Sequence, residues 1–587
     1  MNNDSLSVQD AIQMLDQKIS RDLALVQDLK AQRNTLLPIS RLPPEILCQI
    51  FREVRGNHDY ANYEDDRLWT GTSHSEPCLK WISVSHVSRQ WRCVAINDAH
   101  LWTDPPLKNP QWTMTMLERS RMTTMPAITL NIDELDKHVV NAFTPHIPRV
   151  SHLVLPQMAR DTLHQFLSGL PQEAPRLEAL SINCLARTDS EGATHYIIGN
   201  SSVDQALPFP NHRLCYTPKL RRLQLNGIVI DWNSHLLSHL TTLSMSRIPN
   251  DSKPTPNQFR IMLQSAPNLK RLHLTDVCPS LGRNEGNDQA IPILMQHLEH
   301  LSVEGTMMQL LFFFGSLVAP ALTGVTVHMD FDEHFVSDFS AVLSAMKQPY
   351  LTRIIGSGAD VRRLELGEYE GSLYVRASQI LISERHIEPD ERAPDDYSAH
   401  ALTMWIDSGF EDDEESMDEI KDIVIPALFN NFDWTGLSEL DIAYLVSARP
   451  SILASTFGAL PQLRIVIADD DIAPWLFVAL NLSPNGQSRN NNPSKSNSFS
   501  FPGLRHLAIG RTASIPVDRD FQALRKSLQD RYESGIPIIS LKLDWNPSRA
   551  WACLLLKQCV THVVIKPSRN GQDVVDNYSP YNHDWYL

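Results

Sequence analysis

The chain contains 587 residues, of which 42% are hydrophobic and 7% aromatic, a length that corresponds to about four domains of roughly 150 residues each. This much apolar surface excludes a chain that is disordered as a whole. Acidic residues number 68 against 52 basic ones, which gives a formal net charge of −16 and argues against a globally basic nucleic-acid-binding protein. We therefore expect a folded protein with no nucleic-acid partner.

The eight cysteines are scattered and include no C-x-x-C pair, which argues against a zinc ribbon and against a dense disulfide scaffold. The N-terminal residues contain no basic segment followed by an apolar run. The longest strongly apolar stretch, residues 310–318, is far shorter than the ~20 residues of a membrane-spanning helix. We expect reduced thiols in a soluble protein of the cytoplasm, the nucleus or both, with no membrane partner.

Residues 10–37 contain neither Gly nor Pro, and apolar residues recur there at steps of three, four or seven. This spacing predicts an amphipathic helix over residues 8–37, which Pro38 ends. One interpretation is a short coiled coil through which residues 10–37 self-associate, although Asp22 interrupts the apolar seam. The other is packing of the helix against the next domain. The apolar positions are Ile12, Leu15, Ile19, Val26, Leu29 and Leu36.

The next segment, residues 38–108, contains three short apolar parts. The first, residues 39–54, reads Ile-Ser-Arg-Leu-Pro-Pro-Glu-Ile-Leu-Cys-Gln-Ile-Phe-Arg-Glu-Val, and its two prolines suit the first turn of a helix. A polar loop follows at about residues 56–78, and residues 81–96 then show a second helical pattern. Leu101 and Trp102 follow the turn-forming pair Asn97-Asp98 and form the third part.

These three parts resemble the F-box motif, in which Leu-Pro-x-Glu-Ile/Leu-Leu-x-x-Ile-Phe is followed by Val-Cys-x-x-Trp-Arg-x-x-Ala and then by Leu-Trp. Ser88 stands where the family often has Cys, and the loop at 56–78 is longer than the usual link. A helix followed by Leu-Pro-Pro-Glu also resembles the expanded F-box families of mushroom-forming fungi. The alternative is that residues 42–102 form a small helical core without a partner.

An F-box implies a three-helix module whose exposed apolar face docks on the Skp-type adaptor of a cullin–RING ubiquitin ligase. Exposed apolar surface on so small a unit is typical of a protein interface. The resemblance assigns adaptor binding to Leu42, Pro43, Pro44, Glu45, Ile46, Leu47, Ile50, Phe51, Val87, Trp91, Leu101 and Trp102.

From residue 109 to residue 569 the pattern L-x-x-L-x-L recurs at variable spacing, as in Leu220-Leu223-Leu225 and Leu269-Leu272-Leu274. Such units resemble divergent leucine-rich repeats, in which a short strand alternates with a return segment and neighbours stack to bury a shared apolar face. We therefore expect an α/β fold, an irregular leucine-rich-repeat solenoid with parallel strands on its concave face. An ordinary α/β sheet is the alternative, but central parallel strands there are apolar on both faces, whereas polar residues intervene here.

The intervening polar side chains would line the concave face, where solenoids bind their partners. Their charge changes from basic toward acidic along the chain, from Arg222 and Arg271 toward Glu304, which suggests a bipolar strip that binds a target protein. The candidate target-binding residues are Arg222, Gln224, Arg271, His273, His300, Ser302, Glu439, Asp441 and His506.

Three segments depart from the repeat pattern. Residues 386–422 are rich in acidic residues and are interpreted as a solvated insertion, and residues 483–500 are of low complexity, which is typical of disorder. The tail, residues 570–587, contains four aromatic residues. It is interpreted as a cap on the open end of the solenoid, which is preferred over a segment that folds back across the concave face.

Catalytic motifs are absent from the sequence, which contains no phosphate-binding loop, no dinucleotide-binding glycine motif, no H-E-x-x-H and no G-x-S-x-G. His328, Asp330, Asp332 and His334 alternate in a way that suits metal ligands, but a strand that runs into an acidic loop explains them as well. We expect no catalytic residues, no metal and no cofactor.

The hypothesis that unites these features is a non-catalytic substrate receptor of an SCF-type cullin–RING ligase. The F-box would bind the Skp-type adaptor and the repeats would bind a target protein for ubiquitin-dependent degradation. A leucine-rich-repeat scaffold without a ligase role is the alternative.

Overall fold

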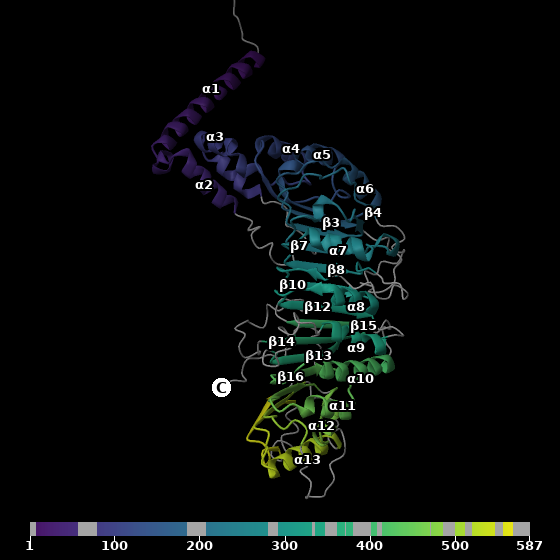
Figure 1. Ribbon diagram of the computed structural model, residues 1–587. Helices are drawn as coiled ribbons and strands as arrows, with labels where there is room; N and C mark the ends of the chain where they lie inside the picture. Colours follow the sequence, from purple (N-terminus) through teal and green to yellow (C-terminus); the bar gives the residue numbers. More distant parts are fainter. Residues whose placement is uncertain are drawn as a thin grey trace, which may run out of the picture. The chain divides into compact units, whose positions relative to one another are not determined.

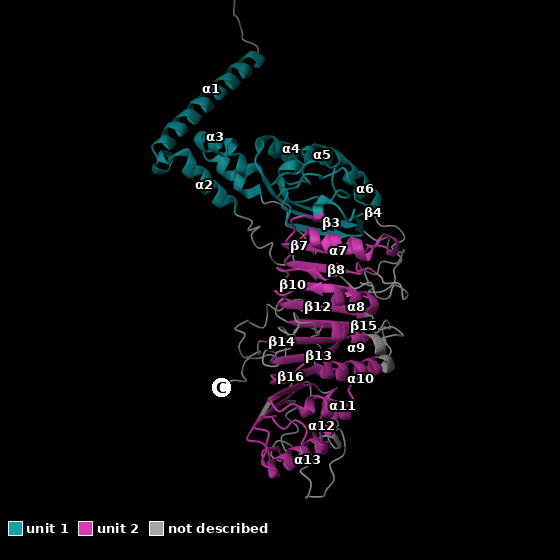
Figure 2. Ribbon diagram, viewed as in Figure 1, with its two compact units in different colours: residues 1–191, 207–236 teal, residues 192–206, 237–587 magenta. Residues whose placement is uncertain are grey.

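The computed structural model describes residues 8–56, 79–184, 207–279, 292–330, 335–346, 361–369, 371–379, 401–407, 414–469, 471–484, 499–510, 519–545 and 556–567. These residues fall into two compact units, one formed by residues 1–191 and 207–236 and the other by residues 192–206 and 237–587 (Figure 2). None of the described helices is long and apolar enough to cross a membrane.

Unit 1 begins with helices and continues into a small α/β layer (Figure 1). Helix α1 lies within the range in which the sequence predicts a helix. Pro44 stands at the start of α2, where no intrahelical N–H bond is lost, and the Ser88 side chain caps α3 by accepting a hydrogen bond from the Trp91 amide. The helical elements are α1 (Val8–Thr35), η1 (Pro38–Arg41), α2 (Pro44–Arg55), η4 (Leu79–His86), α3 (Arg89–Asn97), η5 (Ala99–Trp102), α4 (Pro110–Arg119), α5 (Lys137–Phe143), η6 (Thr144–Arg149) and α6 (Arg160–Gly169).

The main strands of unit 1 are parallel neighbours in the order β1, β2, β3 and β5. The central leucines of the L-x-x-L-x-L pattern share one register, because Leu153 lies beside Leu180 and Leu180 beside Leu223. The side chains of all three are buried, as expected for the apolar face of a layered fold. The strands are β1 (Met125–Thr129), β2 (Val150–Met158), β3 (Ala179–Cys184), β4 (Leu207–Pro208), β5 (Arg222–Asn226) and β6 (Ile228–Val229).

Unit 2 contains a large and mostly parallel sheet in the order β7, β8, β10, β12, β15, β14, β13, β16, β17, β18, β19 and β20. The strands of this sheet are β7 (Thr242–Ser246), β8 (Arg271–Thr275), β10 (His300–Gly305), β12 (Gly324–Asp330), β13 (Arg363–Tyr369), β14 (Ser372–Ser378), β15 (Leu402–Asp407), β16 (Glu439–Tyr444), β17 (Ile465–Ala468), β18 (His506–Ile509), β19 (Ser540–Trp545) and β20 (His562–Pro567). Two short strands, β9 (Ile293–Leu294) and β11 (Leu317–Val318), pair with each other in a separate parallel sheet.

The L-x-x-L-x-L pattern again sets the register in unit 2. Leu243, Leu272 and Leu301 lie side by side on consecutive strands, and Leu440, Val466 and Leu507 do the same further along the sheet. Between strands the chain returns through helices, and helices α7, α8, α9 and α10 lie along one side of the strands (Figure 1). The helices are α7 (Pro256–Ser265), α8 (Met307–Ser316), α9 (Phe335–Met346), α10 (Glu414–Asn431), α11 (Pro450–Ser455), α12 (Ala473–Leu480) and α13 (Arg519–Glu533), with short turns η7 (His235–Leu237), η8 (Asn250–Ser252) and η13 (Phe457–Ala459).

The sheet of unit 2 departs from uniform parallel order at one place. Strand β14 is antiparallel to both β13 and β15, and β15 pairs in parallel with β12. After β12 the chain therefore passes over the positions of β15 and β14 and first forms β13. It then returns toward β12 through β14 and β15. At the centre of this reversal Gly367 lies opposite Tyr374, and a side chain at Gly367 would collide with the Tyr374 ring. The expectation of parallel strands throughout is wrong for β14.

The predicted acidic insertion at residues 386–422 is also corrected in part. Leu402, Met404 and Ile406 alternate along β15 and are buried, a period-two pattern that acidic flanking residues hide in the sequence. Residues from Glu414 onward belong to helix α10, in which Ile420 is buried. Residues 386–400 and 408–413 of this insertion lie outside the described residues, as do most of the segment 483–500 and all of the tail 570–587.

Candidate functional site

The helical part of unit 1 has its own apolar core. Leu47 and Phe51 lie one turn apart on α2 and are fully buried. The Phe51 ring packs against Trp91 of α3, and the Trp81 ring meets Trp102 edge to face, each with centroids 5.0 Å apart. The Trp102 indole N–H donates a hydrogen bond of 2.8 Å to the Ala95 carbonyl, so this buried N–H group has a hydrogen-bond partner. The core comprises Leu47, Phe51, Trp81, Ile82, Val84, Val94, Ala95, Leu101, Trp102 and Met116.

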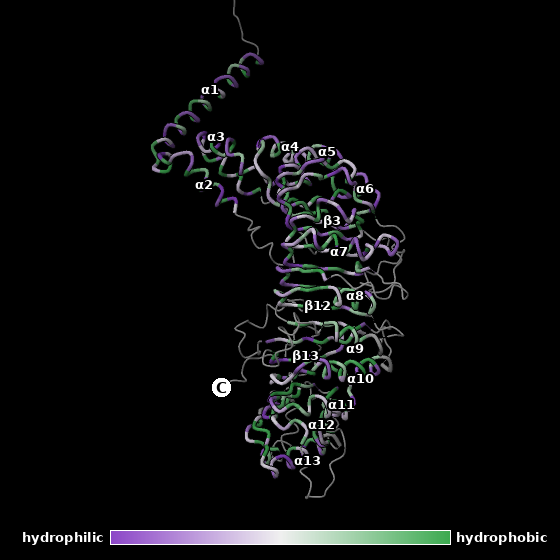
Figure 3. The backbone as a smooth tube through the Cα atoms, viewed as in Figure 1, coloured by the Kyte–Doolittle hydropathy of each residue, from purple (hydrophilic) through white to green (hydrophobic). Residues whose placement is uncertain are grey.

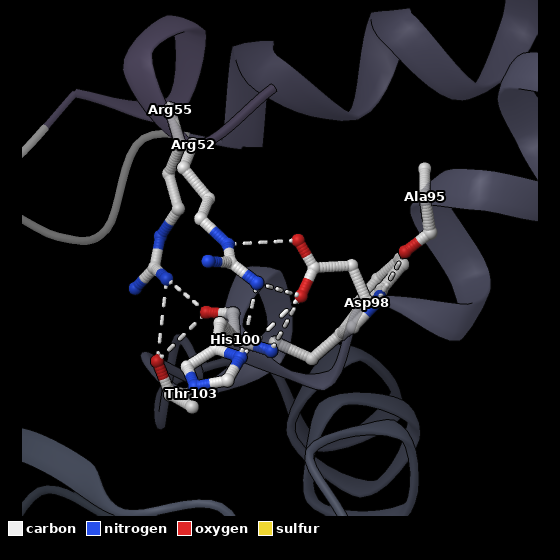
Figure 4. A network of polar contacts seen from close by, with 7 residues as sticks. Arg52, Arg55, Ala95, Asp98, His100 and Thr103 are labelled. Atoms are coloured by element: carbon white, nitrogen blue, oxygen red, sulfur yellow. Dashed lines mark hydrogen bonds and ion pairs between the residues drawn. The ribbon is translucent and has the colours of Figure 1, made fainter. Parts of the chain in front are cut away.

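A buried carboxylate ties α2 to the turn that follows α3. Arg52 Nε donates to Asp98 Oδ2 at 2.9 Å, and Arg52 Nη2 donates to Asp98 Oδ1 at 2.8 Å (Figure 4). Such a paired arrangement of two charge-assisted hydrogen bonds is among the stronger polar contacts in proteins. One turn later, Arg55 Nη1 donates to the His100 carbonyl at 2.6 Å and to Thr103 Oγ1 at 3.2 Å. These contacts join α2 to η5.

The charge state of Asp98 follows from this arrangement. Burial by itself raises the pKa of the Asp98 carboxyl, but the hydrogen bond and positive charge of Arg52, with the His100 amide, outweigh burial and lower the pKa below its ordinary value. The same contact raises the pKa of Arg52. Asp98 is therefore an anion at neutral pH, and the ion pair holds the helices in place.

The structure separates the predicted adaptor-binding residues by exposure. Pro43, Pro44, Glu45, Ile46 and Val87 are exposed, and the side chains of Leu42, Ile50 and Trp91 are partly buried. Four of the twelve residues to which the resemblance assigns adaptor binding lie in the core of the domain and are not accessible on its surface. Those four are Leu47, Phe51, Leu101 and Trp102.

Helix α2 carries an exposed row of apolar side chains that is available to a partner. Ile46 is 40% exposed and Val54 is 55% exposed, and with Ile50 they recur every fourth residue on the helix, where side chains lie on one face. We call Pro43, Ile46, Ile50 and Val54 the α2 apolar surface. Val87, which precedes the cap of α3, is 54% exposed.

Several residues that shape this region were not singled out from the sequence. Val54 belongs to the α2 apolar surface, and Trp112 and Met116 of α4 pack with the core although they lie beyond residue 108. The sequence pattern indicates only a turn at Asp98. The signal for Asp98 was its N-cap position before η5, where its side chain accepts a hydrogen bond from the His100 amide, but no local pattern indicates its pairing with Arg52.

The predicted target-binding residues of unit 1 take part in internal polar contacts. Arg222 Nη2 lies 2.9 Å from His152 Nε2, and Ser181 Oγ donates to Gln224 Oε1 at 2.9 Å. Burial, assisted by the charge of Arg222, lowers the pKa of His152 to about 4. Arg222 and Gln224 are half-buried on β5.

Four predicted target-binding residues of unit 2 form a compact group on β8 and β10. Arg271 lies beside His300, and His273 lies beside Ser302. His273 is exposed and the other three are half-buried, whereas Leu272, Leu274 and Leu301 between them are buried. This alternation produces one apolar face and one polar face. His506 of β18 is also half-buried, and burial, then the charge of Arg505, lowers its pKa.

Glu439 and Asp441 correct the expectation of an acidic surface strip. Both are buried, and both pair with Arg363 of β13: Arg363 Nη2 lies 2.7 Å from Asp441 Oδ2, and Arg363 Nε lies 3.3 Å from Glu439 Oε1. Glu365 joins the cluster through Arg363 and Arg376. These carboxylates have internal cationic partners, as buried charges require.

The suggested metal ligands fall partly outside the described residues, since Asp332 and His334 are not among them. His328 stacks on the Trp405 ring at a centroid distance of 6.0 Å. Burial, then the charge of His273, lowers the pKa of His328 to about 4. Among the described residues no cluster of His, Cys, Asp and Glu suits a metal ion.

An F-box-like family model matches residues 39–107 of the chain. The matched range includes the α2 apolar surface and the Arg52–Asp98 pair. No curated protein matches the chain. F-box domains are typically non-catalytic adaptor modules of ubiquitin ligases. The chain therefore contains an F-box-like domain at residues 39–107, which supports a role as an adaptor in ubiquitin ligase complexes of the SCF type.

Proposed function

We propose that this protein is the substrate-recognition subunit of an SCF-type cullin–RING ubiquitin ligase. The observation that carries the proposal is the F-box-like match at residues 39–107, in a domain whose own core leaves Ile46, Val54 and Val87 exposed. An F-box implies binding to the Skp-type adaptor of a cullin ligase. The exposed apolar residues of α2 supply the chemistry for that contact.

The division between buried and exposed residues suits a rigid docking module. Leu47 and Phe51 pack inside the domain, and the Arg52–Asp98 pair holds α2 against the turn before η5, so the backbone of α2 is ordered before any partner binds. A preordered surface loses less conformational entropy on association. Its apolar residues would form the centre of the interface, and Glu45 and Arg41 would lie at a polar rim.

For the remainder of the chain we propose an irregular leucine-rich-repeat solenoid that binds the target protein. Two features support this proposal: most main strands, with the exception of β1, β13, β14 and β15, fall on the L-x-x-L-x-L segments, and the central leucines of neighbouring strands share one register. The group of Arg271, His273, His300 and Ser302 is the preferred contact for a target, because its side chains lie on the polar face of β8 and β10. Glu439 and Asp441 are not part of this surface.

The mechanism we propose is proximity. A receptor that binds both the adaptor and a target raises the effective concentration of a target lysine near the ubiquitin-loaded enzyme. The chain itself would form no covalent bond, and the partner enzymes of the ligase would transfer ubiquitin. Such a subunit would act in the cytoplasm, the nucleus or both.

The test is a binding measurement between the purified full chain and a Skp-type adaptor. Ile46→Asp with Val87→Asp places charge on two exposed apolar positions without touching the buried core. If each is an interface anchor worth on the order of 2 kcal/mol, the two together contribute about 4 kcal/mol, and the double variant binds roughly 700-fold more weakly. Met114→Asp is the matched control, because Met114 of α4 is 53% exposed and lies off α2.

The outcomes separate the alternatives. Adaptor binding that the double variant loses and the control retains supports the proposal, provided that circular dichroism shows an unchanged helix content. Absence of binding by the natural chain refutes it. Purification from cells with an adaptor and a neddylated cullin favours the ligase subunit, whereas adaptor without cullin favours a leucine-rich-repeat scaffold.

A further inference from the structure

Helix α1 is an amphipathic helix whose apolar side is uncovered. It spans 28 residues, Val8–Thr35, and buries none of them. At a rise of 1.5 Å per residue it is about 42 Å long. Hydrophobic and hydrophilic residues are interleaved along its length (Figure 3), and Ile12, Ile19 and Leu29 are each more than half exposed. A helix of this kind gains most of its stability from packing its apolar face against another element.

The apolar residues of α1 follow a heptad repeat. Isoleucine or valine stands at the first core position of three successive heptads, and leucine stands at the second core position of two of them. β-branched residues at the first position and leucine at the second are typical of two-stranded coiled coils. The first core positions are Ile12, Ile19, Val26 and Arg33, and the second core positions are Val8, Leu15, Asp22, Leu29 and Leu36.

The contacts of α1 with the F-box-like domain leave this seam open. Arg89 Nη2 of α3 lies 3.0 Å from Asp28 Oδ1, and Ser40 Oγ donates to the Asn34 carbonyl at 2.6 Å. Asp28 and Asn34 occupy outer heptad positions. These contacts of the domain with α1 therefore lie on the polar side of the helix.

We propose that α1 pairs with α1 of a second copy of this chain as an antiparallel two-stranded coiled coil centred on Ala24. This register is the one in which Ile19 of one copy packs against Leu29 of the other, and Ile12 against Leu36. Leu23 and Leu25 flank the seam and are both more than half exposed. Near the two-fold axis, Leu23 then packs beside Leu23 of the other copy, and Leu25 packs beside Leu25 of the other copy. A symmetric pair of this kind buries the same patch of both copies.

Charge decides between the two orientations. In a parallel pair in register, Asp22 would face Asp22 and Arg33 would face Arg33 inside the seam, and like charges at a core position oppose pairing. In the antiparallel pair Asp22 lies opposite Val26 and Arg33 opposite Leu15, so neither meets its own copy. Asp16 of each copy then lies beside Lys30 of the other, which gives two symmetric ion pairs that the parallel arrangement lacks.

The first experiment measures the mass of the full chain by sedimentation velocity over a range of concentrations. We expect a concentration-dependent species of twice the monomer mass of 66.5 kDa. Ile19→Asp with Leu29→Asp removes the central apolar layers and should abolish that species. Met14→Asp is the matched control, because Met14 is 60% exposed on α1 but lies outside the seam. A natural chain that is monomeric throughout, or a dimer that survives the double substitution, overturns the proposal.

The second experiment tests orientation by exchanging charges. Asp16→Lys and Lys30→Asp each convert two attractive contacts of the homodimer into repulsive ones, so each should weaken dimerisation by roughly two- to thirty-fold. An equimolar mixture of the two variants should dimerise as tightly as the natural chain, because both contacts of the mixed dimer are again attractive. Weakening without rescue in the mixture refutes the antiparallel register.

Self-association is independent of adaptor docking, because α1 and the α2 apolar surface share no residue. The Ile19→Asp, Leu29→Asp variant should bind the Skp-type adaptor as the natural chain does. Loss of dimerisation and loss of adaptor binding are therefore separate outcomes.

Discussion

Replacing Asp98 by Ala should loosen the F-box-like domain without unfolding the rest of the chain. The Asp98 side chain is 3% exposed, and it accepts hydrogen bonds from two nitrogens of Arg52 and from the His100 amide. Breaking a fully buried ion pair costs about 3–5 kcal/mol. Arg52 is 43% exposed and water can solvate it after the substitution, so we expect a smaller cost of about 2 kcal/mol.

Hydrogen exchange in the full chain measures this cost locally. Amides of α2 and α3 exchange through opening of the domain, and a loss of about 2 kcal/mol should accelerate them roughly thirty-fold. Arg89→Ala is the control, because the Arg89–Asp28 pair is exposed on both sides and should contribute almost nothing. Unchanged exchange of α2 and α3 in the Asp98→Ala variant would refute the assignment of this pair as the link between α2 and η5.

The pH dependence of the same difference provides a second check. The pKa of Asp98 is lowered in the folded domain, so its contribution is fully present above the unfolded-state pKa of about 4 and is lost as pH falls through the folded pKa. The natural chain and the Asp98→Ala variant should therefore differ in exchange near pH 7 and converge in strong acid. A difference that persists when Asp98 is protonated would assign the effect to packing rather than to charge.

Two further predictions concern the strand layers of the two units. The pKa of His152 is about 4 in the folded state against 6.5 ordinarily, so between these pH values the unfolded chain binds a proton that the folded chain does not. The stability of unit 1 should therefore fall as pH drops from about 6.5 to 4. His152→Gln should reduce this pH dependence of the melting temperature, followed by circular dichroism, and an unchanged pH dependence would contradict the role of His152. In unit 2, Asp441→Ala leaves the buried Arg363 guanidinium without its shortest ion pair, which should destabilise this part of the sheet by about 3 kcal/mol. Hydrogen exchange should become faster in β13 and β16, whereas exchange in β7 and β8 should not change.

The sequence predicts the strands that carry an L-x-x-L-x-L segment, because each of them is a local pattern, but it does not predict β13, β14 and β15. The central leucine of an L-x-x-L-x-L segment points to the core in Leu153, Leu272 and Leu440 alike, and neighbouring segments pair at that residue. The reversal at β13, β14 and β15 could not be predicted in this way. Strand order depends on which distant segments pair, and a period-two pattern is the same for a parallel and an antiparallel neighbour.

In the candidate site, too, the sequence predicts the local helix but not the contacts that depend on tertiary packing. Helical spacing predicted that Ile46, Leu47, Ile50 and Phe51 belong to one helix of an F-box-like unit, and the family match agrees with that assignment. The sequence did not separate Leu47 and Phe51, which form the core, from Ile46, which is exposed. Adjacent apolar residues on a broad helix face look alike until the helix that covers part of that face is known.

Local periodicity and motif order, from the sequence alone, thus predicted a helix over residues 8–37, which is observed as Val8–Thr35. They also predicted the three-part helical unit and the strands on L-x-x-L-x-L segments, because hydrophobic spacing is a property of the chain itself. Only the tertiary structure decided which polar residues are surface groups. Glu439 and Asp441 stand at polar positions of a strand pattern, yet Arg363 from another strand neutralises them in the interior. The sequence shows that a residue is ionisable, but whether its charge is exposed to water or paired in the interior depends on the distant segments that pack against it in the fold.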